Sequence, residues 1–249
     1  MARYFIKLSY CGTRYNGWQS QPHIGTSTIQ TTVEDALSTY LRQPVSLVGC
    51  GRTDTGVHAK DYYAHFDTPD LEDLLSIIYR VNKLLPPDIA IHNIIKVHDQ
   101  AHARFDAISR SYEYYLHTSK SPFAHLSYYY VYDQPDLATL NEAAAIVLDY
   151  VDFTTFCKLN TDVHTMNCKI TESYWEQRGD QYIFKISSDR FLRGMIRLIV
   201  GMCLQVARNK VSIEEVRSAI TEKRRIGNDW SVPAVGLILC DIRYPFNLS

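Results

Sequence analysis

The order of the predicted elements constrains the fold of this chain more than any other feature. Alternating apolar and polar residues predict strands, and apolar residues three and four apart predict helices. The first half reads strand, helix, strand, strand, helix, strand, at 3–10, about 29–41, 45–50, 62–67, 71–85 and 89–97. This β-α-β-β-α-β order is typical of a ferredoxin-like unit, in which two helices pack on an antiparallel sheet.

The second half repeats this order without repeating the letters. Strands are predicted at 110–117, 168–175, 182–188 and 237–244, and helices at 137–148, 192–208 and 212–222. Without the shorter helix at 212–222, the order is again β-α-β-β-α-β. We therefore expect an α+β fold of two ferredoxin-like halves, residues 1–105 and 106–249, with a central, mainly antiparallel sheet. We also expect a cleft between the halves, where sites usually form.

Composition argues against several classes of protein. With 249 residues, of which 46% are hydrophobic and 21% charged, the chain can bury a large core. Its six cysteines include no C-x-x-C pair, so neither a zinc site nor a disulfide framework is expected. No signal peptide or membrane-length apolar run is visible, and we expect a cytoplasmic protein with no membrane contact. The net charge of −1 argues weakly against nucleic acid as a partner but permits a local basic groove.

The stretch 49–59 carries the densest chemistry. Three glycines flank Arg52, Asp54 and two threonines. Glycine permits backbone angles closed to other residues, so such a loop can hold a carboxylate at the rim of a sheet. A plain turn in which Asp54 caps a neighbouring segment explains the same letters, because Asp and Gly are ordinary turn residues. Asp54 is nevertheless the only group whose local sequence argues for catalysis.

Three arginines stand at or just before the start of the apolar helix 192–208. Arg190, Arg193 and Arg197 are spaced by three and four residues, which would place them on one face. An arginine among apolar neighbours needs a carboxylate partner, and Asp54 is the candidate if the two halves close on each other. The alternative is a solvated arginine edge.

The strand 110–117 places Arg110, Tyr112 and Tyr114 on one face. Ordinary aromatic packing within a sheet explains this spacing. A stacking platform for nucleic-acid bases beside phosphate-binding arginines explains it as well, because aromatic side chains stack on bases.

Several motifs in order along nearly the whole chain resemble the TruA-type tRNA pseudouridine synthase family. Residues 51–59, GRTDTGVHA, resemble the family's G-R-T-D-x-G-V-H-A signature. Further matches are YCGTRYNGWQ at 10–19, HARF at 102–105, RSYEY at 110–114, DFTTF at 152–156 and FLRGMIR at 191–197. So many ordered matches are specific, whereas any one alone would be weak.

The resemblance implies a fold, a reaction and partners. The family's fold is a core of two related α/β halves with a cleft between them. Its members use no metal and no organic cofactor, and they usually act as homodimers that share a tRNA. They isomerise uridine to pseudouridine at positions 38, 39 and 40, in the anticodon arm. These properties become our expectations for this chain.

Four residues match the family's functional positions. Asp54 matches the catalytic aspartate, and Arg52 matches the arginine linked with flipping the target nucleotide out of its stack. Tyr112 matches the tyrosine that lies against the target base, and Arg197 matches the arginine that pairs with the aspartate. On this resemblance, Asp54 is catalytic and Arg52, Tyr112 and Arg197 bind substrate.

The chain departs from the family pattern at Cys11, at Asp61-Tyr62 and at Gly194, where the family usually has Asp, Gly-Gln and Asn. None of these departures removes the catalytic group. One rival interpretation is a tRNA-binding protein of the same fold without catalysis, which retention of the four matched residues argues against. A second is a nuclease or hydrolase, which would need a metal cluster or an activated water that the sequence does not indicate.

Overall fold

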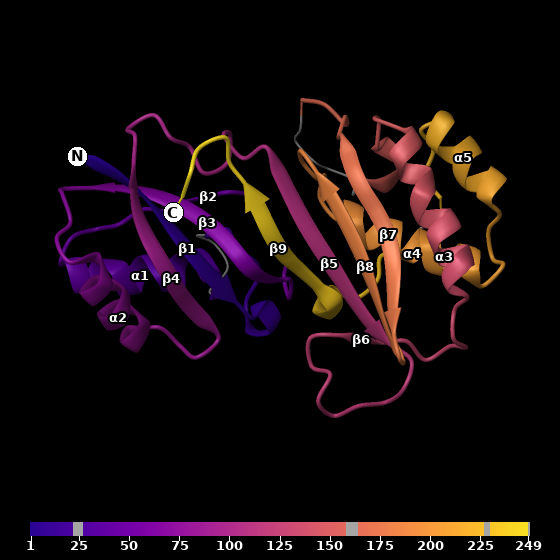
Figure 1. The fold of residues 1–249 in the computed structure, drawn as a ribbon, viewed down its shortest axis with the longest axis horizontal. Helices are drawn as coiled ribbons and strands as arrows, with labels where there is room; N and C mark the ends of the chain where they lie inside the picture. The colour runs from indigo at the N-terminus through magenta and orange to yellow at the C-terminus, as the bar shows by residue number, and fades with distance from the viewer. Residues whose placement is uncertain (22–26, 158–163, 227–229, 249) are drawn as a thin grey trace. The chain divides into compact units, whose positions relative to one another are not determined.

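The computed structural model describes residues 1–21, 27–157, 164–226 and 230–248, and the chain forms two compact units (Figure 1). Unit 1 contains Met1–Ser109 together with Ile238–Ser249, and unit 2 contains Arg110–Leu237. Each unit packs helices on mainly antiparallel strands, which confirms the predicted α+β fold class.

Unit 1 has the ferredoxin-like order that the sequence predicted. Its elements are β1 (Ala2–Tyr10), α1 (Ile29–Leu41), β2 (Val48–Gly49), β3 (His58–Thr68), α2 (Leu74–Leu84) and β4 (Ile89–Val97). Strand β1 lies between β3 and β4 and is antiparallel to both, so that Leu8 is opposite Tyr62 on one side and Ile91 on the other. Because β1 is the central strand of the three, six of its nine residues are buried.

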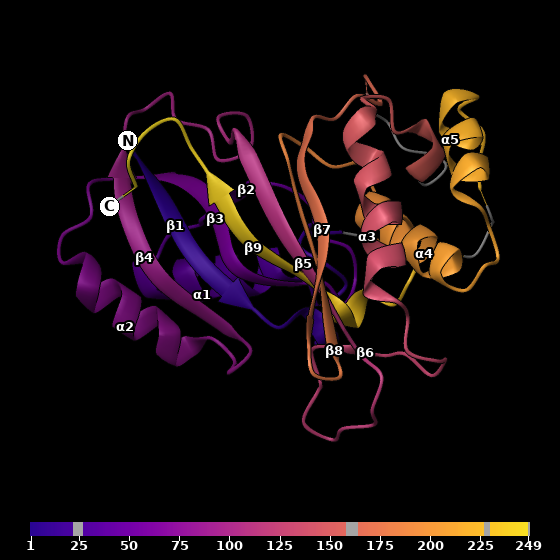
Figure 2. The same ribbon diagram turned by 45° about the vertical axis from the view of Figure 1, so that its right-hand side comes forward.

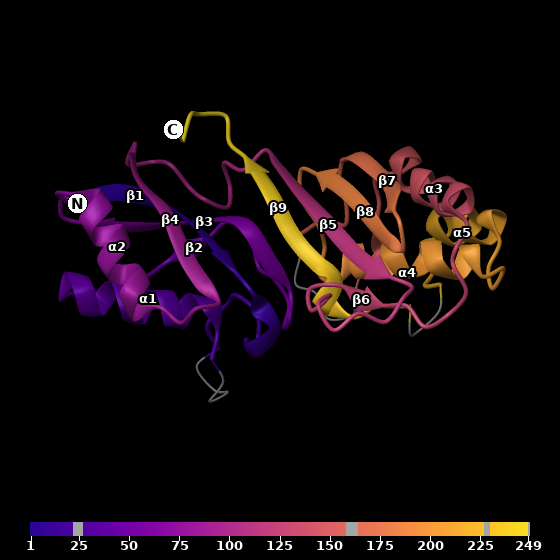
Figure 3. The ribbon, with the colours of Figure 1, turned by 60° about the horizontal axis from the view of Figure 1, so that its bottom comes forward.

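Both faces of β1 are covered, although the alternation in 3–10 suggested one polar face. Phe5 is fully buried on the face that the sequence assigned to Arg3, Lys7 and Ser9. Its ring makes edge contacts with the rings of Tyr244 and Phe246, at centroid distances of 5.3 and 5.9 Å. Figure 3 shows the C-terminal segment on the side of the strands opposite α1. Aromatic residues from the end of the chain therefore complete the core of unit 1.

The predicted strand 45–50 is reduced to β2, which has only two residues. Side chains of α1 take the hydrogen bonds that a neighbouring strand would otherwise make. The Val45 amide donates to Ser38 Oγ at 2.9 Å, and the Leu47 amide donates to Glu34 Oε1 at 2.7 Å. Val45 and Leu47 are still buried, so the apolar pattern predicts their burial correctly but not the partner of their backbone.

The last strand, β9 (Leu237–Arg243), lies mostly in unit 1, whereas the sequence prediction assigned it to the second half. It pairs in parallel with the start of β3, with His58 opposite Ile238. The Ile108 amide donates to the carbonyl of Arg243 at 2.8 Å. Because of these bonds, β9 is grouped with unit 1, whereas a division at residue 105 places it in the second half.

Unit 2 contains mainly antiparallel strands covered by helices (Figure 2). Its elements are β5 (Ser109–His117), β6 (Tyr128–Tyr129), α3 (Leu137–Ala145), β7 (Ile170–Arg178), β8 (Gln181–Ser188), α4 (Met195–Ala207) and α5 (Ile213–Thr221). Strand β8 lies between β5 and β7, and α3 packs against both β7 and α4. The predicted hairpin turns at Gly179, whose φ of 63° suits glycine.

No helix in the described ranges combines the length and the apolarity needed to cross a membrane. The longest, α1 and α4, have 13 residues each.

A buried histidine in unit 1 makes the stability of the fold depend on pH. Burial, followed by the positive charges of Arg3 and His102, lowers the pKa of His65 from 6.5 to about 4. Its Nδ1 accepts a hydrogen bond from the Ala103 amide at 3.1 Å, which only the unprotonated nitrogen can do. The neutral imidazole is therefore the native form.

We expect unit 1 to lose stability as the pH falls from about 6.5 towards 4. In this window the unfolded chain binds a proton at residue 65 that the native state excludes, so the contribution is complete above pH 6.5 and is lost as the pH approaches 4. The shift corresponds to about 3 kcal/mol. Urea unfolding between pH 7 and 4 measures it, and His65→Asn, whose amide oxygen can accept from Ala103, serves as the control. An equally steep loss in His65→Asn would contradict the assignment.

Candidate active site

Asp54 stands at the first position of a tight turn between β2 and β3. Its carbonyl accepts a hydrogen bond from the Val57 amide at 3.1 Å, and Gly56 has a φ of 79°. A positive φ at the third residue defines a type II turn, which explains why glycine follows Thr55. Asp54 is half-buried, whereas Arg52 is exposed. The turn therefore fixes the backbone that carries the carboxylate and leaves Arg52 accessible at the surface.

A second loop, residues 10–18, holds the Asp54 turn in place. The hydroxyls of Tyr10 and Thr53 are 2.9 Å apart, and Thr53 is 8% exposed. The Trp18 amide donates to the Thr53 carbonyl at 3.2 Å, and the Gly56 amide donates to the Tyr15 carbonyl at 3.4 Å. The residues on both sides of Asp54 are thus tied to the same neighbouring loop. The family match at 10–19 did not predict this supporting role.

Two features of this loop pair depend on particular side chains. Gly17 has a φ of 81°, and a Cβ there would lie 2.4 Å from the Thr53 carbonyl oxygen. His58 is 2% exposed, and its Nδ1 accepts a hydrogen bond from the Gly12 amide at 2.9 Å. That bond assigns the neutral imidazole with its proton on Nε2. The glycines and the histidine of the two motifs therefore serve the packing of one loop against the other.

Tyr62, one of the departures from the family pattern, is integrated into this arrangement. It is fully buried, its ring centroid lies 4.0 Å from that of Trp18, and its hydroxyl donates to the Gly51 carbonyl. The Cys50 amide donates to the neighbouring carbonyl of Tyr63 at 2.8 Å. Strand β3 therefore also supports the loop that carries Asp54, and Tyr62 contributes a direct hydrogen bond to that loop.

The departure at Cys11 changes the side chain but leaves a fixed backbone. The Cys11 amide donates to the Asp88 carbonyl at 2.9 Å, and the sulfur lies 3.4 Å from Thr13 Oγ1. The Asp88 carboxylate accepts hydrogen bonds from Arg14 and Tyr15, each at 2.8 Å. Burial, with the hydrogen bond to Asp88, raises the pKa of Tyr15, so its hydroxyl keeps the proton that it donates.

In unit 2, Tyr112 lies on β5 with its ring half-buried. The ring meets that of Phe191 edge to face, with centroids 5.4 Å apart and an interplanar angle of 86°. Tyr114, two residues along, is fully buried and donates to the Pro233 carbonyl at 2.9 Å. Of these two tyrosines, Tyr114 is therefore core, and Tyr112 retains exposed ring surface that could contact a base.

Arg197 lies in the first turn of α4, where its Nε donates to the Val232 carbonyl at 2.6 Å. Arg190 and Arg193 precede the helix, which begins at Met195, so the three arginines do not share a helical face as the spacing suggested. Gly194 occupies the N-cap with a φ of 73°. Glycine and asparagine are the residues that adopt this left-handed conformation most readily, which accounts for Gly194 where the family usually has Asn.

The four predicted site residues are divided between the units. Arg52 and Asp54 share one loop of unit 1, whereas Tyr112 and Arg197 belong to unit 2. The pairing of Asp54 with Arg197 and the cleft that would contain it stay predictions. Within the described ranges, no three His, Cys, Asp or Glu side chains converge as a metal site would require. The loop of unit 1 therefore offers the carboxylate of Asp54 and, two residues before it, the exposed guanidinium of Arg52.

Comparison with known proteins gives a consistent result. A family model described as tRNA pseudouridine synthase matches residues 150–245. A relative from Parabacteroides distasonis, named tRNA pseudouridine synthase A, is 47% identical over 249 residues, covering 100% of this chain and 98% of its own. Relatives of the same name from Porphyromonas gingivalis and Bacillus subtilis are 48% and 35% identical, covering 100% and 95% of this chain and 99% and 97% of theirs.

The fold and these relatives define an RNA-modifying isomerase. The chain belongs to the tRNA pseudouridine synthase family, which confirms the resemblance of its motifs.

Proposed function

We propose that this member of the family isomerises uridine to pseudouridine at positions 38, 39 and 40, in the anticodon arm of tRNA. The similarity over the whole chain to relatives named tRNA pseudouridine synthase A is the observation that carries the proposal. The loop that holds Asp54 supports it, because each end of that loop is fixed by hydrogen bonds from residues 10–18.

We propose Asp54 as the catalytic residue and Arg52, Tyr112 and Arg197 as substrate-binding residues. A uracil must leave its stack before its glycosidic bond can break, at a cost of a few kcal/mol. Stacking on the exposed surface of Tyr112 and a phosphate contact from Arg52 would offset part of this cost. Arg197, if paired with Asp54, would give the carboxylate an opposite charge.

The reaction exchanges one bond for another within the same nucleotide. The bond between N1 of uracil and C1′ of ribose breaks, the base rotates, and a bond from C5 to C1′ forms. The proton on C5 is lost and N1 gains one, so no atom is added or removed overall. Ionised Asp54 either attacks C1′ as a nucleophile or removes a proton from the sugar. Both routes need a carboxylate held next to the ribose and no cofactor.

Mapping of pseudouridine in a defined tRNA tests the proposal. Transcripts carrying uridine at 38, 39 and 40 are incubated with and without the protein, and transcripts with cytidine at these positions serve as the control. We expect new pseudouridine at these positions only. Conversion elsewhere would refute the positional assignment. Binding of tRNA without any conversion would favour the alternative, an RNA-binding protein of the same fold without catalysis.

We also propose a cytoplasmic homodimer that binds tRNA. The family resemblance supports the dimer, and tRNA as substrate supports the compartment. Sedimentation equilibrium of the protein alone should give the mass of two chains, and the mass of one chain would contradict the dimer.

A further inference from the structure

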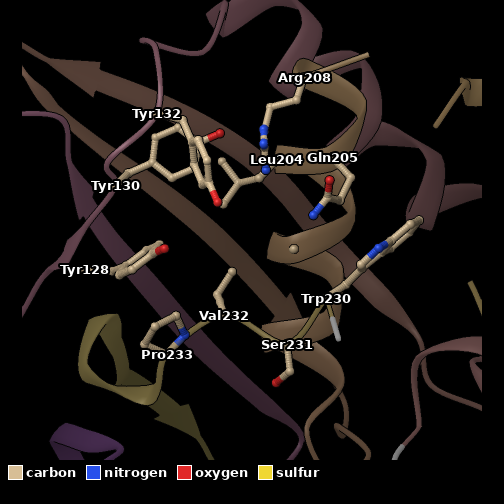
Figure 4. A pocket seen from close by; sticks show the side chains of 11 residues that line it. Tyr128, Tyr130, Tyr132, Leu204, Gln205, Arg208, Trp230, Ser231, Val232 and Pro233 are labelled. Carbon is tan, nitrogen blue, oxygen red and sulfur yellow. The ribbon is translucent and has the colours of Figure 1, made fainter. Parts of the chain in front are cut away.

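Unit 2 contains a pocket beside the C-terminal half of α4, with a volume of about 180 Å³ (Figure 4). Four of its eleven lining residues are aromatic, the side chains of Gln205, Arg208 and Ser231 are polar, and Leu204, Val232 and Pro233 are apolar. The residues that matter here are Tyr128, Tyr130, Tyr132, Gln205, Arg208 and Trp230. No Asp or Glu lines it among the described residues.

Local structure explains why these side chains converge. Strand β6 pairs with β5, and the Tyr130 amide donates to the His117 carbonyl at 2.9 Å. These bonds fix the segment from which Tyr128, Tyr130 and Tyr132 reach the pocket. The opposite wall approaches α4 very closely, because a Cβ at Gly201 would lie 1.7 Å from the Trp230 carbonyl oxygen. Both walls are therefore fixed by backbone contacts rather than by long side chains.

The chemistry of the lining suits a planar ring with polar groups at its edge. The Arg208 guanidinium lies over the Tyr132 ring, 3.7 Å from its centroid, and Tyr132 is 49% exposed. The Gln205 amide adds one donor and one acceptor group. The Tyr130 hydroxyl is buried and has no hydrogen-bond partner in the described part of the chain. Such groups are rare in folded proteins, and an occupant of the pocket could supply the missing partner.

The size of the pocket limits what fits. An engineered cavity of about 150 Å³ binds benzene, so about 180 Å³ holds one six-membered ring with its substituents rather than a whole nucleotide. Unpaired bases of RNA are commonly recognised by stacking on aromatic rings and arginine planes, with hydrogen bonds to their edges. A pyrimidine base matches the pocket in size, and the Arg208 guanidinium and the Gln205 amide in the lining match its ring and its polar edge.

We propose that this pocket binds an unpaired pyrimidine base of the tRNA other than the uridine that is isomerised. The inference rests on the proposed function for the identity of the RNA. Arg208, the C-cap of α4, follows Arg197 by 11 residues, which is about 16 Å along a helix. The Arg208 end of the pocket therefore lies well beyond the turn assigned to the target site, while Val232 at the other end accepts the hydrogen bond from Arg197. The second base would hold the RNA while the target uridine leaves its stack.

Single substitutions test the pocket through tRNA affinity. Tyr132→Ala and Arg208→Ala should each raise the KM for tRNA about tenfold, within the range found when stacking aromatics are truncated, and leave kcat at saturating tRNA unchanged. Tyr130→Phe removes only the unpartnered hydroxyl, so it should weaken tRNA binding without lowering the melting temperature. Tyr174→Ala, an exposed tyrosine on β7 outside the pocket, is the matched control and should change neither constant.

Direct binding provides a readout independent of catalysis. Trp18 and Trp175 are 1% and 3% exposed, whereas Trp230 is half-buried at the pocket wall. We expect cytidine or uridine to quench the fluorescence of the wild type and not that of Trp230→Phe.

Each outcome has one meaning. Absence of quenching together with an unchanged KM in both alanine variants would overturn the pocket assignment and leave the proposed function intact. Failure of the wild type to form pseudouridine would instead refute the proposed function, while nucleoside quenching would still report on the pocket. If Tyr132→Ala or Arg208→Ala changes the oligomeric mass of the protein but keeps its affinity for tRNA, the pocket is part of a contact between protein chains, and the inference is overturned.

Discussion

Replacement of Asp54 by asparagine should abolish pseudouridine formation while leaving tRNA binding largely intact. Asparagine has nearly the same size, and the backbone carbonyl of residue 54 that accepts the Val57 amide is unchanged by the substitution. The amide can neither attack C1′ nor take a proton from the sugar at neutral pH. Loss of a residue that acts directly in chemistry typically costs about 10⁴-fold or more in kcat. Single-turnover conversion and filter binding of tRNA measure the two effects separately.

Asp61→Asn is the matched control for this experiment. Asp61 lies on β3, seven residues after Asp54, where its carboxylate forms an ion pair with Lys7 at 2.9 Å. A partly exposed pair of this kind contributes at most about 1 kcal/mol, so the variant should fold and convert tRNA normally. Conversion at the wild-type rate by Asp54→Asn would remove Asp54 from the chemistry. Equal loss in both variants would point to a general electrostatic effect.

The sequence predicted those parts of the fold that depend on local periodicity. The strands and helices of unit 1 occur in the predicted order because their apolar positions follow simple repeats of two or of three and four residues. The position of β9 was harder to predict. Its parallel pairing with β3 joins residues about 180 positions apart, and no local pattern encodes that choice of neighbour.

The motif at 51–59 identified Asp54, but the loop that supports it came only from the structure. The hydrogen bond between Tyr10 and Thr53 and the acceptance of the Gly12 amide by His58 join segments more than 40 residues apart. Glycine and aromatic residues are dense at 10–18, which is typical of a loop, but the sequence does not indicate which segment such a loop contacts.

Gly12 is the position in this supporting loop where an added methyl group should have the largest effect. A Cβ at Gly12 would lie 2.0 Å from the Val57 carbonyl oxygen, well inside van der Waals contact. The backbone is held by further hydrogen bonds at both residues, since the Gly12 amide donates to His58 and the Val57 amide donates to the carbonyl of Asp54. Relief of the clash therefore has to move one loop relative to the other.

We expect Gly12→Ala to destabilise the protein by about 1–3 kcal/mol, the usual cost of overpacking, and to lower kcat about 100-fold, because displacement of a catalytic group by about 1 Å has an effect of that size. Gly51→Ala is the stability control, since no atom lies within 4 Å of a Cβ at that position in the loop that carries Asp54. Urea unfolding should show a loss only in Gly12→Ala. If Gly12→Ala folds with unchanged stability and converts tRNA at the wild-type rate, the close approach of the two loops does not position Asp54. If its kcat falls while its stability does not, the added methyl group has moved the carboxylate without loosening unit 1, and the positioning role of the 10–18 loop stands apart from its role in folding.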